Sequence, residues 1–178
     1  GSCEFPDGCT DEKAINYDPE ASCDNGTCQS KIHGCIDKKY IEYNPQANIE
    51  DESCKTELDI GLKYLGGYIF ELNYKNNGEP FGKVVSESDL GTFTWEEART
   101  KAITSNINDF DDWYIPDVAD FNSIYRAIEK IEQNNFDKHY WTSKPYKTLS
   151  AIVFDMSNNN SCSTSIQYKY KLRVIRAF

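Results

Sequence analysis

The placement of cysteine constrains this chain more than any other feature. Six of the seven cysteines lie within the first 54 residues. Inside that segment, residues 8–28 (GCTDEKAINYDPEASCDNGTC) and 34–54 (GCIDKKYIEYNPQANIEDESC) align without a gap at an offset of 26. A short segment with many cysteines and few apolar residues is typical of a disulfide framework formed in an oxidising compartment.

The repeat also restricts how the cysteines can pair. Each copy has one cysteine after its first glycine and one at its end, which favours the bridges Cys9–Cys28 and Cys35–Cys54. Cys3 and Cys23 are then left over, and a bridge between them is the remaining option. Zinc is the alternative, but structural zinc sites use closely spaced cysteine pairs, and only Cys23 and Cys28 approach that spacing. We therefore predict disulfides.

Few side chains inside the repeats can form a core. Tyr17 and Tyr43 occupy matching positions, and we predict that they pack on the bridges. The acidic residues favour a solvated surface that requires no cofactor. Calcium held by Asp18 and Asp24 is an alternative, although their spacing matches no EF-hand loop.

The two repeats resemble the GCTD-x-x-A-x-NYDP-x-A-x-x-DDGSC repeats of secreted, multi-domain surface proteins of Bacteroidetes-type bacteria. The first copy carries most of the pattern, from Gly8 through Asn16-Tyr17-Asp18-Pro19 to Cys28, and the second copy matches it more loosely. The resemblance implies a spacer between functional domains at the bacterial cell surface. We therefore expect residues 1–56 to form a stalk, and an export signal and any anchor to lie outside this sequence.

Charge and hydropathy exclude two classes of partner. The net charge is −10, whereas nucleic acids and acidic membranes require a clustered basic surface. No stretch approaches the roughly 20 apolar residues of a membrane helix, so we expect no membrane insertion. A local basic patch stays open, because the last twelve residues (QYKYKLRVIRAF) carry four positive charges and no negative ones.

Residues 57–178 have the pattern of an α+β domain with a mostly antiparallel sheet. Thr94-Trp95-Glu96-Glu97 is a capping box that predicts one helix, and Asp117 is the predicted cap of a second helix, whose apolar spacing continues to Ile131. Strands are expected at residues 66–72, 82–86, 139–143, 149–154 and 168–175. We expect Trp113 and Trp141 to be buried.

The order GGYIFEL, TWEEA, DDWYIP, YWTS and LRVIRAF resembles the Legionella-collagen-like C-terminal domain family. That family shows GG-x-x-F, W-x-x-A, DWRLP, YWSS and VRAVRAF in this order. The resemblance covers about residues 60–178 and implies a C-type-lectin-like fold. Tyr114 replaces the arginine of DWRLP, and Lys144-Pro145-Tyr146 follows Ser143 in place of small residues. These departures indicate that the ligand loop is particular to this chain.

The expected ligand residues lie in polar segments between strands, because amides and ammonium groups bind hydroxyls and exposed aromatic rings bind sugar faces. They are Lys144, Tyr146, Asn158, Asn159, Asn160, Tyr170 and Arg173. For Arg173 a ligand contact and a buried ion pair are equally open. For Arg176 we predict a bidentate pair with Asp111 or Asp112.

The sequence therefore predicts a secreted, non-catalytic, adhesin-like module that binds a glycan or a protein receptor. The first alternative is an assembly module, such as a homotrimer at a fibre tip. A formylglycine-generating-type oxidase is more remote, because its copper site normally needs two cysteines, and Cys162 is the only cysteine after residue 56. Cys162 is expected to be a buried or half-buried free thiol. His33 and His139 have no evident catalytic partner, and we predict no enzyme activity.

Overall fold

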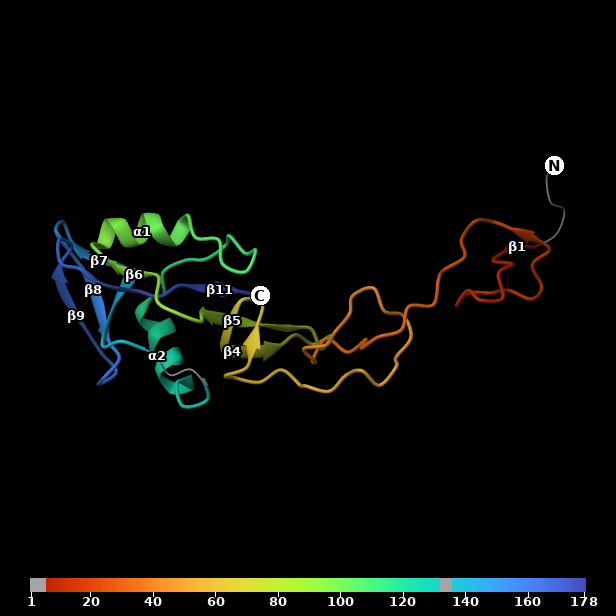
Figure 1. Cartoon of the computed structure of the whole chain (residues 1–178), viewed down its shortest axis with the longest axis horizontal. Coiled ribbons are helices and arrows are strands. Elements are labelled where there is room, and N and C mark those ends of the chain that lie inside the picture. The colour runs from red at the N-terminus through yellow and green to blue at the C-terminus, as the bar shows by residue number, and fades with distance from the viewer. Residues whose placement is uncertain (1–5, 132–135) are drawn as a thin grey trace. The chain divides into compact units, whose positions relative to one another are not determined.

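The computed structural model describes residues 6–131 and 136–178. The chain divides into two compact units, Gly1–Glu57 (unit 1) and Leu58–Phe178 (unit 2). The boundary falls one residue after the position expected from the change in composition. Unit 1 is coloured from red to yellow-orange in Figure 1, and unit 2 from yellow to blue.

Each repeat of unit 1 closes its own disulfide. The bridges are Cys9–Cys28 and Cys35–Cys54, each with a sequence separation of 19, which confirms this part of the predicted pairing. Cys23 is also in a disulfide, and Cys3, the partner predicted for it, lies outside the described residues. In the part of unit 1 that the structure describes, regular structure is limited to β1 (Asp7–Gly8) and β2 (Cys23–Asp24), which pair in parallel.

The two repeats share the same backbone hydrogen bonds. The amide of Asp18 donates to the carbonyl of Cys9 at 2.9 Å, and the amide of Asn44 donates to that of Cys35 at the same distance. Asp18 and Asn44 are 26 residues apart, as are the two cysteines. The sequence repeat is therefore also a structural repeat.

The buried residues of unit 1 include the first cysteine of each bridge and neither of the two tyrosines. Cys9, Ala14 and Cys35 are at most 5% exposed. The prediction for Tyr17 was wrong, because its side chain is 39% exposed, and Tyr43 is only half-buried. Instead, the main chains of the two tyrosines form parallel β-bridges with Cys9 and Cys35.

In each repeat, the turn just before the last cysteine contains a residue with a left-handed backbone conformation. Gly26 has φ 74° in the first copy, and Glu52 has φ 63° at the matching position of the second. Each amide donates to an acidic side chain two residues earlier, Asp24 or Glu50, at 3.0 Å. Glycine adopts this conformation without strain, whereas a residue with a Cβ does not.

Unit 2 is an α+β domain with two sheets that are antiparallel except for one parallel pair. The four-stranded sheet has the order β11-β5-β4-β3, and the five-stranded sheet has the order β6-β10-β7-β8-β9. The strands are β3 (Lys63–Tyr64), β4 (Gly67–Tyr74), β5 (Pro80–Ser86), β6 (Gly91–Phe93), β7 (His139–Lys147), β8 (Ser150–Asp155), β9 (Asn160–Ser165), β10 (Tyr170–Leu172) and β11 (Ile175–Ala177).

Both predicted helices are present in unit 2, and both begin where the caps indicate. α1 (Trp95–Ile103) follows Thr94, whose amide donates to Glu97 Oε2 at 2.8 Å. α2 (Val118–Ala127) follows Asp117, whose carboxylate accepts from the amide of Asp120 at 2.8 Å. Figure 1 shows α1 and α2 on opposite sides of the strands that join the two sheets.

Adjacent residues of β7 serve two apolar clusters. Trp141 belongs to the cluster that contains Trp95, Ala98 and Ala102 of α1, whereas Tyr140 belongs to the cluster that contains Phe121 of α2. Side chains alternate between the faces of a strand, so both faces of β7 are covered. Trp113 and Trp141 are 2% and 0% exposed, as predicted.

The C-terminal run departs from the prediction of one strand over residues 168–175. It forms two strands, and β10 joins the five-stranded sheet while β11 joins the four-stranded sheet. The four basic residues of this run are also separated. Lys171 lies 3.8 Å from Asp89, and Arg176 lies 2.6 Å from Asp112. The basic patch left open by the sequence therefore does not form.

Arg176 and Asp112 make the predicted bidentate pair. Arg176 Nε donates to Asp112 Oδ1 at 2.6 Å, and Nη2 donates to Oδ2 at 3.1 Å. The remaining nitrogen, Nη1, donates to the carbonyl of Leu65 at 3.1 Å, and the guanidinium lies 3.8 Å from the ring centroid of Phe110. This contact ties β11 to the loop before α2.

Candidate ligand-binding groove

The ligand residues predicted from the sequence do not line one surface. Lys147 pairs with Ser150 at one end of β8, and Asp155 pairs with Asn160 at the other end. A six-residue strand is about 17 Å long, so the 144–147 segment and the 158–160 segment lie at opposite ends of the sheet. Lys144 and Tyr146 also belong to β7 and Asn160 belongs to β9, where loops were expected.

Arg173 is not a surface residue. Its side chain is 1% exposed, and Nε donates to the carbonyl of Ser86 at 3.1 Å. Nη2 donates to the carbonyl of Glu87 at 2.5 Å. The ligand role predicted for Arg173 is therefore wrong, because the guanidinium fixes the segment after β5. Burial lowers the pKa of this arginine.

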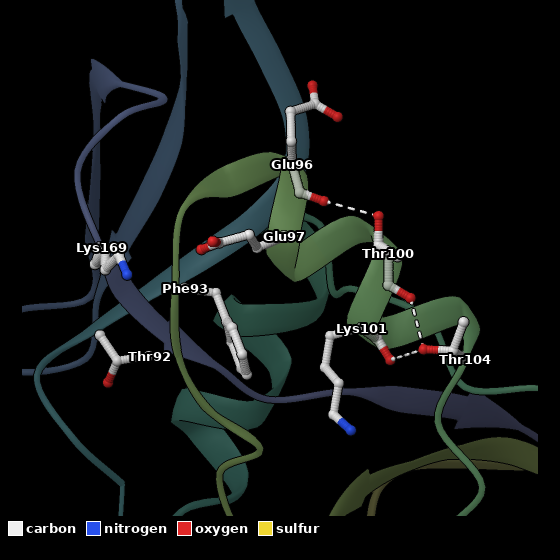
Figure 2. Close-up of a pocket in the computed structure, with 8 residues that line it drawn as sticks. All are labelled: Thr92, Phe93, Glu96, Glu97, Thr100, Lys101, Thr104 and Lys169. Atoms are coloured by element: carbon white, nitrogen blue, oxygen red, sulfur yellow. Dashed lines mark hydrogen bonds between the residues drawn. The ribbon is translucent and has the colours of Figure 1, made fainter.

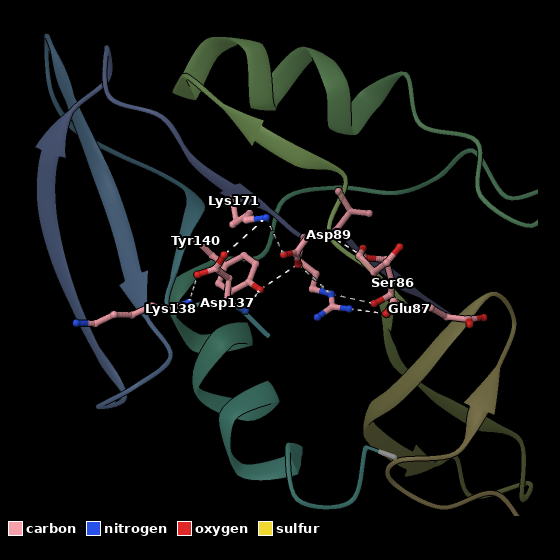
Figure 3. A network of polar contacts seen from close by, with 10 residues as sticks. Ser86, Glu87, Asp89, Asp137, Lys138, Tyr140 and Lys171 are labelled. Carbon is pink, nitrogen blue, oxygen red and sulfur yellow. Dashed lines mark hydrogen bonds and ion pairs between the residues drawn. The ribbon is translucent and has the colours of Figure 1, made fainter. Parts of the chain in front are cut away.

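A polar network that is only partly buried surrounds that arginine. Tyr140 donates from its hydroxyl to Asp89 Oδ1 at 2.9 Å, and Arg173 Nε lies 3.6 Å from the same oxygen. Lys171 lies between Asp89 and Asp137, at 3.8 and 3.6 Å (Figure 3). Burial raises the pKa of Asp89 and of Tyr140. Every one of these groups contacts another, so the network is structural.

Tyr170 is half-buried between other rings. Its ring meets Trp141 edge to face with the centroids 5.0 Å apart, and His139 lies 5.8 Å away. His139 in turn lies 3.6 Å from Asp155, whose carboxylate accepts from the Ser157 hydroxyl at 2.6 Å. Most of the Tyr170 ring is therefore used in packing, and its site role stays a prediction.

An open groove of about 680 Å³ runs along the polar side of α1 (Figure 2). One wall is the helix, and the other consists of β6 and the residue before β10. The lining residues are Thr92, Phe93, Glu96, Glu97, Thr100, Lys101, Thr104 and Lys169. Three hydroxyls, two carboxylates, two ammonium groups and one ring therefore meet in this groove.

The helix side of the groove is held by local bonds. Glu97 is fixed by the Thr94 amide, which lowers the pKa of its carboxyl, and the positive charge of Lys169 acts in the same direction. The hydroxyls of Thr100 and Thr104 donate to helix carbonyls one turn back, at 3.2 and 2.9 Å. Their lone pairs stay available as acceptors. The carbonyl of Lys101 accepts from the Ser105 hydroxyl at 2.6 Å, whereas the ammonium groups of Lys101 and Lys169 make no hydrogen bond or ion pair with the described residues.

One exposed aromatic ring lies next to a groove residue in the sequence. Tyr168 precedes Lys169 and is 60% exposed. The segment before it joins two elements, because Ile166 donates to the carbonyl of Leu149 and accepts from the amide of Trp95, both at 3.2 Å. The start of α1 and the turn between β7 and β8 therefore share this end of the sheet.

The sequence contained a signal for this groove that was missed. Thr100 occupies an exposed position inside α1, where threonine is a poor helix former, and Thr104 is the residue that caps the end of this helix. Their spacing places them on one stripe with Glu96 and Glu97. The opposite wall, Lys169, is 65 positions beyond Thr104 and could not be placed by sequence spacing.

One cluster in the described ranges has the residue types of a metal site. The only group of three close ligand-type side chains found there is Cys35, Glu50 and Cys54, and its two cysteines form a disulfide. Asp18 and Asp24 each accept a turn amide, at 2.9 and 3.0 Å. Calcium at these two residues stays a prediction.

Cys162 is exposed rather than buried, which corrects the expectation for this thiol. It lies on β9, opposite Val153 of β8.

The chain matches no protein-family model and no curated protein. None of the helices in the described ranges is long and apolar enough to cross a membrane.

Proposed function

We propose that unit 2 is a non-catalytic recognition module with a C-type-lectin-like fold, and that it binds a glycan in the groove along α1. Unit 1 serves as the disulfide-stapled spacer of an adhesin-like protein at a bacterial cell surface. Its oxidised cysteines are compatible with a secreted protein.

The composition of the groove carries the proposal. Its charges are balanced, with Glu96 and Glu97 against Lys101 and Lys169. Sugars present many hydroxyls, which both donate and accept, so they match a surface of mixed donors and acceptors. Phe93 provides the apolar area of the groove on which a sugar face can pack. An open groove also suits a chain of several sugars better than a single small molecule.

A glycan array probed with the full chain, in calcium and in EDTA, tests this function. We expect weak, sugar-competable binding that is the same in both buffers, because the groove residues need no metal. An array without hits in either buffer overturns the glycan proposal and favours a protein receptor.

Matched variants locate the site. Lys169→Met and Thr92→Val remove polar groups of the groove while keeping side-chain size, and each should weaken a hit about tenfold, the usual effect of losing a hydrogen bond to a charged or polar group. Ile103→Thr, at an exposed position of the same helix, is the control. Tyr146→Ser and Asn158→Ser test the loops predicted from the sequence. If one of these two weakens binding and the groove variants do not, the site lies at that residue's end of β8 instead.

A further inference from the structure

β9 is the longest unprotected sheet edge in the described part of unit 2. It is the outer strand of the five-stranded sheet and has six residues. The other outer strands, β6, β11 and β3, have three, three and two residues. Short edges offer few free main-chain groups, which is one way in which proteins prevent edge-to-edge pairing.

β9 lacks the other usual protections as well. Its sequence, NSCSTS, contains no charge and no proline. Its pairing with β8 runs from Asn160 to Ser165 without a register shift, so no bulge turns the edge away. Within the described ranges, the only main-chain bond to this strand from outside β8 is the turn from the Tyr168 amide to the Ser165 carbonyl. The Ser161 amide also donates to the side chain of its neighbour Asn160 at 2.8 Å. The other main-chain N–H and C=O groups on the outer side of β9 are open to a further strand.

We propose that β9 pairs in antiparallel fashion with β9 of a second copy, so that the two five-stranded sheets join across a two-fold axis. Identical uncharged strands are self-complementary, because no like charges oppose each other. A two-fold contact uses this edge in both copies, and the remaining edges are short. The product is therefore a closed dimer rather than a fibre.

The position of Cys162 sets the register. A two-fold axis through Cys162 places this residue opposite Cys162 of the second copy. It also places Ser161 of each copy opposite Ser163 of the other. Facing residues in an antiparallel pair have Cα atoms about 4.5–5.5 Å apart, within the range of about 4.4–6.8 Å that a disulfide spans. Cys162 is exposed and is the only free cysteine among the described residues, so its thiol can report this register.

Sedimentation velocity of the full chain tests the pairing without covalent capture. Cys162→Ser keeps the edge and removes the thiol, and its mass should rise from monomer to dimer with concentration. Adding Ser161→Lys and Ser163→Lys places like charges opposite each other and should weaken the dimer about tenfold. Ser161→Lys with Ser163→Glu places opposite charges across the axis and should restore it. Tryptophan fluorescence checks that each variant is folded.

Oxidation by diamide tests the register in the chain that retains Cys162. The two thiols lose two protons and two electrons to the azo bond of diamide, and one S–S bond forms between the copies. A dimer band should appear on a non-reducing gel, and the Ser161→Lys/Ser163→Lys chain should lack it. A monomer at every concentration, or equal cross-linking in both chains, overturns the proposal. Glycan binding in the groove is measured separately and does not depend on this result.

Discussion

Replacing Asp112 by asparagine should destabilise unit 2 measurably. Asp112 is the only charged partner of Arg176 among the described residues, and the two side chains are 53% and 10% exposed. The substitution leaves a largely buried guanidinium with the Leu65 carbonyl and the Phe110 ring as its remaining contacts. Hydrogen bonds to charged groups contribute about 1.5–3 kcal/mol. Because Asp112 is half exposed, solvent screening reduces this value, and we expect a loss of about 1.5 kcal/mol.

The stability loss caused by Asp112→Asn should also become smaller as the pH falls. The bond from Arg176 holds the pKa of Asp112 below its usual value, so the folded state favours the carboxylate. Its contribution is fully present above the unfolded pKa of about 4 and is lost as the pH falls through the lower folded pKa. The difference between the two proteins should therefore be constant near neutral pH and shrink below about pH 4.

Urea unfolding followed by tryptophan fluorescence measures this loss, because Trp95, Trp113 and Trp141 all lie in unit 2. Asp111→Asn is the matched control at the adjacent exposed position, and its effect should stay within about 0.5 kcal/mol. Equal effects of the two substitutions, or a difference that does not change with pH, would refute the reasoning.

Two predictions concern unit 1. Glu52→Gly should raise the free energy of unfolding of the second repeat by about 1 kcal/mol, because a left-handed conformation costs a non-glycine residue about this much. Amide exchange of residues 35–54 measures this gain. Gly26→Glu should lower the free energy of unfolding of the first repeat instead. Addition of a reductant should unfold unit 1, since loss of native bridges costs a small module about 2–5 kcal/mol, while tryptophan fluorescence of unit 2 stays unchanged. A fluorescence change on reduction would show that unit 2 depends on the bridges.

Local signals in the sequence predicted the helix starts and the strands β4, β5, β7 and β8. Thr94 and Asp117 cap helices because their side chains and main chains bond within one turn, which depends on neighbouring residues alone. The end of α2 was less predictable. The apolar period continues to Ile131, which is buried, but the regular helix stops at Ala127. The apolar spacing only requires that Ile131 is buried, and a turn can bury this side chain as well as a helix can.

Tertiary pairing decided what local patterns could not. Residues 168–175 read as one strand, but the chain changes sheet at Arg173-Val174, where a buried guanidinium bonds the carbonyls after β5. Residues 158–160 were expected in a polar loop, but Asn160 begins β9, because β8 offers an edge to pair with. The groove was missed for the same reason, since Lys169 reaches α1 only through the order of strands in the sheet.

The disulfides of unit 1 have a mechanical consequence for the spacer role that we propose for this unit. Tension along the main chain passes through each S–S bond, so the 19-residue loops that the bridges close cannot be pulled out. Each loop would otherwise add about 65 Å of contour length. Only the residues outside the loops can extend, and the tether stays short under load. A reducing environment removes this limit one repeat at a time, because each repeat holds its own bond.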